Sequence, residues 1–266
     1  KLRADTSHTY KAVCMVHNET STGVTSNVSN VRNAMDAVGH SALLMVDTIS
    51  SLGSISYQHD AWGVDVTVSG SQKGLMLPPG LGFNAISEKA LQISKSNGLT
   101  RSYWDWQAMI ANNASGFFPY TPATNLLYGL QESLSMLTEE GLDKVFSRHD
   151  RMAEATRRAV QAWGLEVLCK NPDEYSSVLT GVMMPDGVDA DAVRKVILDN
   201  FDMSLGMGLG KMKGKILRIG HLGEINELTL IGALSGVEMG LSLAEVSYQK
   251  GGVAHAMSYL TETAER

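Results

Sequence analysis

Strand-like and helix-like apolar patterns alternate along the first half of the chain. Residues 11–17 form a continuous apolar run, typical of a parallel strand that is buried on both faces. Four apolar residues then recur at spacings of three and four, which places them on one face of a helix: Val28, Val31, Met35 and Val38. A second apolar run follows at residues 42–46, and a second such cycle leads to a third run at residues 64–69. This alternation predicts an α/β fold with a parallel sheet and helices on its faces.

Amphipathic helices dominate the second half. One helix is predicted over residues 125–138, and a longer one over residues 142–163. Beyond them the pattern predicts two strand–helix pairs, over residues 178–184, 190–198, 215–219 and 227–241. Asn226 is a suitable N-cap for the last helix. We therefore expect a large domain over residues 1–145 and a smaller C-terminal α/β domain over residues 146–266.

Polar side chains follow three of the predicted strands. Residues 17–20, Asp47 and residues 71–73 all fall at carboxyl ends of strands, where parallel sheets bind their ligands. A lysine and a carboxylate at neighbouring strand ends, here Lys73 and Asp47, suit pyridoxal phosphate chemistry. The lysine amine forms a Schiff base with the cofactor aldehyde, and the carboxylate keeps the pyridine nitrogen protonated. From spacing alone, a surface lysine and an aspartate that caps the next turn explain the same residues.

Several sequence blocks occur in the order seen in class V aminotransferases. Five of them carry the comparison, at residues 17–23, 44–47, 69–73, 77–80 and 218–223. Residues 103–106 and 119–122 agree as well. Because five ordered blocks at compatible spacing are a specific signal, the chain resembles this family, most closely its serine–glyoxylate type. The resemblance runs from about residue 10 to about residue 259.

The resemblance implies a fold type I architecture, with a large domain that binds pyridoxal 5′-phosphate, and gives roles to four residues. Lys73 would hold the cofactor covalently and move a proton between the substrate Cα and the cofactor C4′ atom. Asp47 would pair with the pyridine nitrogen, and Gln72 would contact the cofactor phosphate or its waters. Thr20 would place a hydroxyl near the ring oxygen, although a local turn hydrogen bond also explains a threonine there.

Three further residues have roles in binding. Arg218 interrupts an otherwise apolar strand, where an unpaired charge would be costly, so it should have a partner. Its planar guanidinium suits a bidentate pair with a substrate α-carboxylate, and the alternative is an internal salt bridge to a helix carboxylate. The resemblance implies that Tyr120 and Thr121 reach the cofactor phosphate of the neighbouring subunit, in a homodimer with a shared active site.

Transfer of an amino group from serine to glyoxylate, giving hydroxypyruvate and glycine, is the reaction that the resemblance implies. Alanine as the amino donor is the alternative. Family members carry further chain ahead of the first strand, with a phosphate-binding loop and an aromatic ring that stacks on the cofactor. We therefore expect the sequence to be an incomplete polypeptide, whose chemistry belongs to the complete enzyme. A truncated, non-catalytic interaction subunit of the same fold is the other alternative.

Composition narrows the remaining classes. The net charge of −6 gives no indication of nucleic-acid or anionic-membrane binding, and no apolar stretch approaches the ~20 residues that span a bilayer. Cys14 and Cys169 lie in apolar runs, so buried thiols and a cytoplasmic location are expected. The histidines show no metal-ligand spacing, so no metal site is expected. The glycine-rich run at residues 206–211 lacks the context of a phosphate loop and is interpreted as a mobile loop.

Overall fold

The computed structural model of the 266-residue chain describes residues 1–96 and 98–264. The chain divides into two compact units. Unit 1 contains residues 1–17, 27–49 and 57–136, and unit 2 contains residues 18–26, 50–56 and 137–266. The predicted domain boundary between residues 145 and 146 stays a prediction. The helix that crosses it, α5 (Leu142–Ala162), lies wholly in unit 2.

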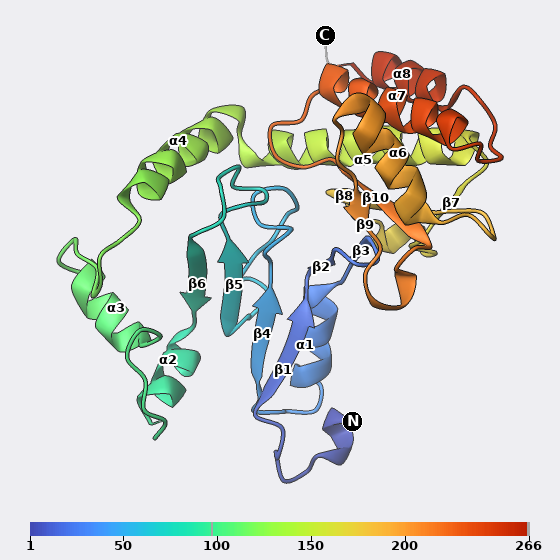
Figure 1. Cartoon of the computed structure of the whole chain (residues 1–266). Helices are drawn as coiled ribbons and strands as arrows, with labels where there is room; N and C mark the ends of the chain where they lie inside the picture. The colour runs from blue at the N-terminus through green and yellow to red at the C-terminus, as the bar shows by residue number, and fades with distance from the viewer. Residues whose placement is uncertain (97, 265–266) are drawn as a thin grey trace. The chain divides into compact units, whose positions relative to one another are not determined.

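A four-stranded sheet forms the centre of unit 1 (Figure 1). Its order is β1 (Ala12–Val16), β4 (Leu43–Asp47), β5 (Val66–Gly70) and β6 (Gly82–Ile86). The β1–β4 and β4–β5 pairs are parallel, and β6 is antiparallel to β5. The mostly parallel sheet confirms the α/β fold class that the sequence predicts.

One face of this sheet is covered by helix α1 (Val28–Asp36), which begins at the N-cap Asn27. Val28 and Met35 of α1 pack with Leu44 and Val46 of β4 in a buried cluster. Because successive residues of a strand point to opposite faces, the remaining residues of β4 lie on the other face. The predicted site residue Asp47, at the end of β4, therefore lies on that second face.

Strand β1 differs from its prediction. Its residues alternate between exposed and half-buried, so the expectation of burial on both faces is wrong. The physical reason is that β1 is an outer strand of the described sheet, and α1 covers only one of its faces. Cys14 is consequently exposed rather than buried, whereas Cys169 is buried as expected.

The predicted second strand–helix–strand cycle is also wrong. Residues 48–65 connect β4 to β5 through turns and bends, with no helix in this fully described stretch. Serine and glycine recur in the run Ser50-Ser51-Leu52-Gly53-Ser54, and both residues favour turns over helix.

Three helices follow β6. They are α2 (Glu88–Lys95), α3 (Trp106–Asn113) and α4 (Thr124–Glu140). The side chains of Ser87 and Asp105 cap α2 and α3 by accepting hydrogen bonds from main-chain N–H groups of the first turn. Helix α4 confirms the prediction over residues 125–138, whereas α2 and α3 were not predicted.

Unit 2 is built on an antiparallel sheet. Its order is β7 (Glu166–Val167), β8 (Leu179–Met183), β10 (Ile216–Gly220) and β9 (Gly206–Met207). The helices are α5, α6 (Ala190–Phe201), α7 (Glu227–Leu243) and α8 (Gly252–Glu262). A separate hairpin joins β2 (Asn18–Glu19) to β3 (Val24–Thr25). The predicted strands and helices of this half are confirmed, and β7, β9 and α8 are additions.

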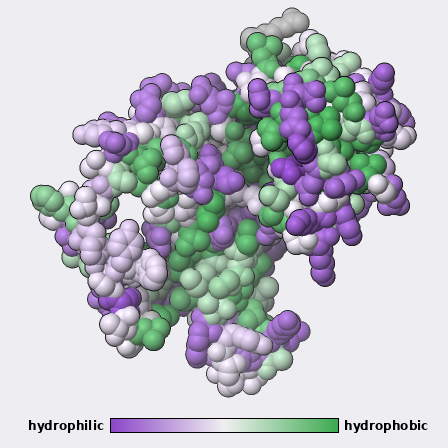
Figure 2. Space-filling model, viewed as in Figure 1, coloured by the Kyte–Doolittle hydropathy of each residue, from purple (hydrophilic) through white to green (hydrophobic). Residues whose placement is uncertain are grey.

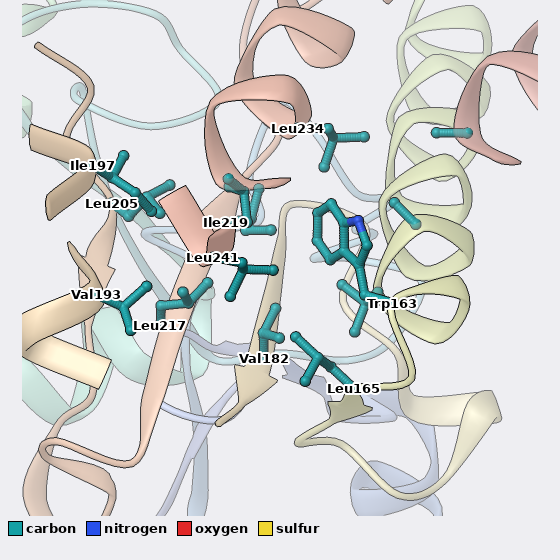
Figure 3. Packing of buried hydrophobic residues seen from close by; sticks show 14 of the residues in the cluster. Trp163, Leu165, Val182, Val193, Ile197, Leu205, Leu217, Ile219, Leu234 and Leu241 are labelled. Carbon is teal, nitrogen blue, oxygen red and sulfur yellow. The ribbon is translucent and has the colours of Figure 1, made fainter. Parts of the chain in front are cut away.

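The core of unit 2 is continuous from α5 to α7. Trp163, at the end of α5, packs in one buried cluster with Val182 of β8, Leu217 of β10 and Leu234 of α7 (Figure 3). Full burial of a valine or leucine side chain contributes about 1.5–3 kcal/mol to the free energy of unfolding. Helix α7 starts at Asn226, whose side chain accepts a hydrogen bond from the Thr229 N–H, as the sequence predicts.

Candidate functional site

Asp47 lies on the open face of the unit 1 sheet. It is the last residue of β4 and is paired with Val16 of β1 and Val68 of β5. A groove of about 410 Å³ on this face is lined by Asp47 and by apolar side chains, including Cys14, Val16 and Val68. Figure 2 shows hydrophobic residues, in green, at the surface over these strands. The volume lies within the range of small-molecule sites, and Asp47 is the groove's charged residue.

The carboxylate of Asp47 is held by the chain that follows it. Its Oδ1 atom accepts a hydrogen bond of 2.9 Å from the main-chain N–H of Ile49. This is the local cap that the sequence left open as an alternative. The same bond also fixes the direction of the carboxylate at the edge of the groove.

Lys73 follows β5, the strand next to Asp47, in a loop that is closed by Ser71. The hydroxyl of Ser71 donates to the Pro78 carbonyl at 2.7 Å and accepts from the Leu81 N–H at 3.2 Å. The main chain of Ser71 bonds to Leu77 and Leu81, each at 3.1 Å. Asp47 and the Lys73 loop therefore leave the sheet at the carboxyl ends of two hydrogen-bonded parallel strands, as predicted.

Gln72 packs against the end of β5. A Cβ atom on Gly70 would lie 2.8 Å from Gln72 Oε1, so the side-chain amide folds back over Gly70. The side chain of Gln72 is exposed, and that of Lys73 is half-buried.

Tyr120 and Thr121 lie elsewhere in unit 1, on an exposed segment. The phenol oxygen of Tyr120 is hydrogen-bonded to the Ser102 hydroxyl, and its ring lies 5.2 Å from the ring of Tyr103. The structure thus groups Tyr120 with other surface residues of its own segment, and its expected role toward the cofactor phosphate stays a prediction.

Thr20 and Arg218 come together in unit 2. The Nη1 atom of Arg218 donates to the main-chain carbonyl of Thr20 at 2.6 Å, and Nε donates to the carbonyl of Met207 at 2.7 Å. These partners hold the guanidinium but carry no charge. Burial, and then the nearby positive charge of Arg194, lower the pKa of Arg218, while Glu19 opposes the shift. An anion is therefore the ligand that this guanidinium favours.

Strand β9 supplies residues that sequence reasoning missed. A Cβ atom on Gly206 would lie 3.0 Å from Arg218 Cβ and 3.2 Å from Nε, so a glycine gives the arginine its room. Met207 supplies one of the two carbonyl oxygens. The interpretation of residues 206–211 as a mobile loop is wrong at Gly206 and Met207, because they pair with β10. The signal in the sequence was a glycine run directly before the Arg218 strand.

Helix α5 holds the segment that follows β10. His149 donates from Nδ1 to the Val145 carbonyl at 2.7 Å, which leaves Nε2 to accept from the Gly223 N–H at 3.1 Å. Arg148 donates to the Gly223 carbonyl at 2.8 Å and forms a bidentate ion pair with Glu140. Burial lowers the pKa of His149, so the ring is neutral and can act as this acceptor. The sequence predicts the helix that carries His149 but gives this residue no role.

Across residues 1–96 and 98–264, no group of three His, Cys, Asp or Glu side chains is arranged to hold a metal ion. None of the described helices combines the length and the apolar character needed to cross a bilayer.

Comparisons with known proteins show the family of the chain. The family model described as Aminotransferase class-V matches residues 1–208. The serine–glyoxylate aminotransferase of Methylorubrum extorquens is 50% identical, covering 98% of this chain and 66% of that protein. The L-aspartate–glyoxylate aminotransferase of Paracoccus denitrificans is 41% identical, covering 98% of this chain and 66% of its own length.

A solved structure shows the same fold. The pyridoxamine–pyruvate aminotransferase from Mesorhizobium loti superposes with a TM-score of 0.90 at 29% identity, covering 99% of this chain and 67% of that one. The chain spans about 66% of the length of the curated relatives named above. Since the family model matches most of the chain, from residue 1 to residue 208, the chain belongs to the class-V aminotransferase family.

Proposed function

We propose that the complete protein is a pyridoxal phosphate-dependent transaminase that moves the amino group of serine to glyoxylate. The observation that carries the proposal is the placement of Asp47 and the Lys73 loop at the ends of adjacent parallel strands. The family assignment and the 50% identity to a serine–glyoxylate aminotransferase support the reaction. Alanine as amino donor is the alternative.

The residues of unit 1 fit the cofactor. A carboxylate in an apolar groove suits a protonated pyridine nitrogen, because the apolar walls strengthen the attraction between opposite charges. Asp47 is held in direction by the Ile49 N–H, and Lys73 provides an amine on the next strand's loop. When bound, pyridoxal phosphate supplies the electron sink for the reaction at the substrate Cα atom.

The proposed site residues have two kinds of role: Lys73 moves a proton, and Gln72, Thr20 and Arg218 bind the cofactor or the substrate. Lys73 would hold the cofactor through its amine and would carry the proton between the substrate Cα and the cofactor C4′ atom. Gln72 would hold the cofactor phosphate, and Thr20 would hold the ring oxygen through its hydroxyl. Arg218 binds the α-carboxylate of both the amino acid and the 2-oxo acid, since it is cationic and its described bonds in unit 2 go to neutral carbonyls.

We also propose a homodimer in which Tyr120 and Thr121 reach the cofactor phosphate of the second subunit. Six exposed aromatic side chains, which are costly to leave in water, lie between residues 103 and 128 and support such a surface. We propose a cytoplasmic location as well, supported by the free thiols of Cys14 and Cys169.

Lys73→Ala tests the function. The variant of the complete protein should keep its fold but lose both turnover and the borohydride-fixed link to pyridoxal phosphate, because it lacks the amine. Absorbance near the visible range, peptide mapping after borohydride treatment and a serine–glyoxylate assay measure this. Lys144→Ala, at an exposed position of α5, is the matched control and should behave like the wild type.

Two results would contradict the proposal. Near-normal turnover of Lys73→Ala would remove Lys73 from the reaction. Wild-type complete protein that fixes no pyridoxal phosphate would instead support the alternative of a non-catalytic interaction subunit.

A further inference from the structure

The loop that carries Lys73 has an unusual conformation between its two ends. It is closed at its start by the bonds of Ser71, which is fully buried. Past Lys73, Met76 has a φ of 58°, in the left-handed region that side chains rarely adopt. Such a conformation persists only where the surrounding structure holds it, so the loop needs an external support near Met76.

Helix α4 provides this support. The Ser133 hydroxyl donates to the Leu75 carbonyl at 2.5 Å, and both residues are buried. One turn earlier, a Cβ atom on Gly129 would lie 2.8 Å from Leu77 Cδ2, so the absence of a side chain leaves room for that leucine. The loop residue Gly80 also lies close to α4, because a Cβ atom on it would lie 2.5 Å from Leu126 Cδ1. Leu126, Gly129 and Ser133 are spaced by three and four residues and so form one face of the helix.

We propose that this face of α4 positions Lys73 for its reaction with the cofactor, with Ser133 as the decisive contact. The Leu75 carbonyl lies two residues beyond Lys73, in a buried place where a lost donor is costly. Ser71 fixes the loop before Lys73 and Ser133 fixes it after, so the lysine main chain is held from both sides. The inference rests on the proposed role of Lys73, and Ser133 acts only through the loop.

Ser133→Ala in the complete protein tests the proposal, with Ser135→Ala as the matched control. Ser135 lies on the same helix, is exposed, and donates to the Gln131 carbonyl within α4. Two quantities are measured: total bound pyridoxal phosphate, and the fraction of it that borohydride fixes to Lys73. In Ser133→Ala we expect the equilibrium constant for fixing the bound cofactor to fall about tenfold, which lowers this fixed-to-bound ratio. In Ser135→Ala the ratio should stay unchanged.

The ratio separates positioning from general stability. A purely structural serine would lower the melting temperature and the amount of folded protein, but it would leave the fixed-to-bound ratio of the folded protein intact. An unchanged ratio in Ser133→Ala therefore overturns the proposal. Hydrogen exchange of the cofactor-free protein adds a second readout, since the Met76 and Leu77 amides should exchange faster than in Ser135→Ala.

Gly129→Ala decides the case if Ser133→Ala does not fold. Its added methyl group would lie 2.8 Å from Leu77 Cδ2 and crowds that buried side chain while the Ser133 bond remains possible, so the fixed-to-bound ratio should again fall. An unchanged ratio in folded Gly129→Ala overturns the proposal. If the wild type itself fixes no cofactor on Lys73, the proposed function fails, and that result is distinct from a failure confined to the α4 variants.

Discussion

Arg218 shows how a single side chain can be held without being neutralised. Its described hydrogen bonds go to the carbonyl oxygens of Thr20 and Met207, and Gly206 leaves the space that its stem requires. The sequence predicted that an arginine in this strand has a partner, and left a substrate carboxylate and a helix carboxylate open. The sequence does not indicate main-chain carbonyls as partners, because no pattern of residue types marks them.

Arg218→Lys tests the carboxylate role at this residue. Lysine keeps the charge but loses the two-point contact, so serine and glyoxylate should both bind less well. We expect a loss of about 1.5–3 kcal/mol, or roughly tenfold to a hundredfold in kcat/KM, measured by steady-state kinetics for both substrates. Arg158→Lys, on a partly exposed arginine of α5, is the control. A lower melting temperature with an unchanged kcat/KM for serine would show instead that Arg218 stabilises the fold and does not bind the substrate.

At the scale of elements, apolar periodicity predicts the long helices but not the short ones. Helices α4, α5, α6 and α7 have long apolar stripes or runs, and the sequence predicted all four. The eight-residue helices α2 and α3 are set mainly by their caps, Ser87 and Asp105, which are weak signals in a single sequence. The exposure of Cys14 could not be predicted either, because it depends on which face α1 covers and not on the strand itself.

His221, which directly follows β10 and is hydrogen-bonded to Thr180 of β8, leads to a prediction for the pH dependence of stability. His221 is buried, donates from Nδ1 to the Ser177 carbonyl, and accepts at Nε2 from the Thr180 hydroxyl. Burial lowers its pKa to about 3 from an ordinary 6.5. Between these values the unfolded chain binds a proton that the folded chain does not, so stability falls as the pH drops below about 6.5. The slope is about 1.4 kcal/mol per pH unit for each such histidine.

His221→Asn removes this titration while keeping a donor for Ser177. The variant should be less stable at pH 7 and should have a shallower loss of stability between pH 6.5 and 5, measured by urea unfolding. This range excludes the carboxylates with lowered pKa, such as Glu140, whose contribution is lost only below about pH 4.5. His17 and His149 are unchanged in the variant and supply the remaining slope, since burial lowers the pKa of both. Equal slopes in variant and wild type would contradict the prediction.

At the scale of the whole molecule, the sequence predicts where Asp47 and Lys73 lie in the sheet but not how each is held. Asp47 and Lys73 were identified from strand ends, and the structure adds the Ile49 cap and the Ser71 closure. Ser133 lies about sixty residues from Lys73 in the sequence, and its partner is a main-chain carbonyl. Contacts of this kind depend on the tertiary fold and leave no spacing pattern along the chain.

The exposed aromatic surface of unit 1 carries the prediction for assembly. Trp104 is 81% exposed and Tyr128 is 73% exposed, and both belong to residue types that dominate interface energies. In a two-fold dimer each substitution acts twice, because the same patch occurs on both subunits. If Trp104→Lys costs about 2 kcal/mol on each side, the dimer dissociation constant should rise about a thousandfold.

Sedimentation equilibrium over a range of protein concentrations measures this constant. Leu228→Lys is the matched control, because Leu228 is an equally exposed apolar residue, 85% exposed, on α7 of unit 2. It removes an exposed apolar side chain and adds the same charge, so a general effect of charge or solubility would appear in both variants. A shift toward monomer in Trp104→Lys alone locates the interface on unit 1. A dissociation constant equal to that of the wild type would show that the aromatic segment does not hold two subunits together.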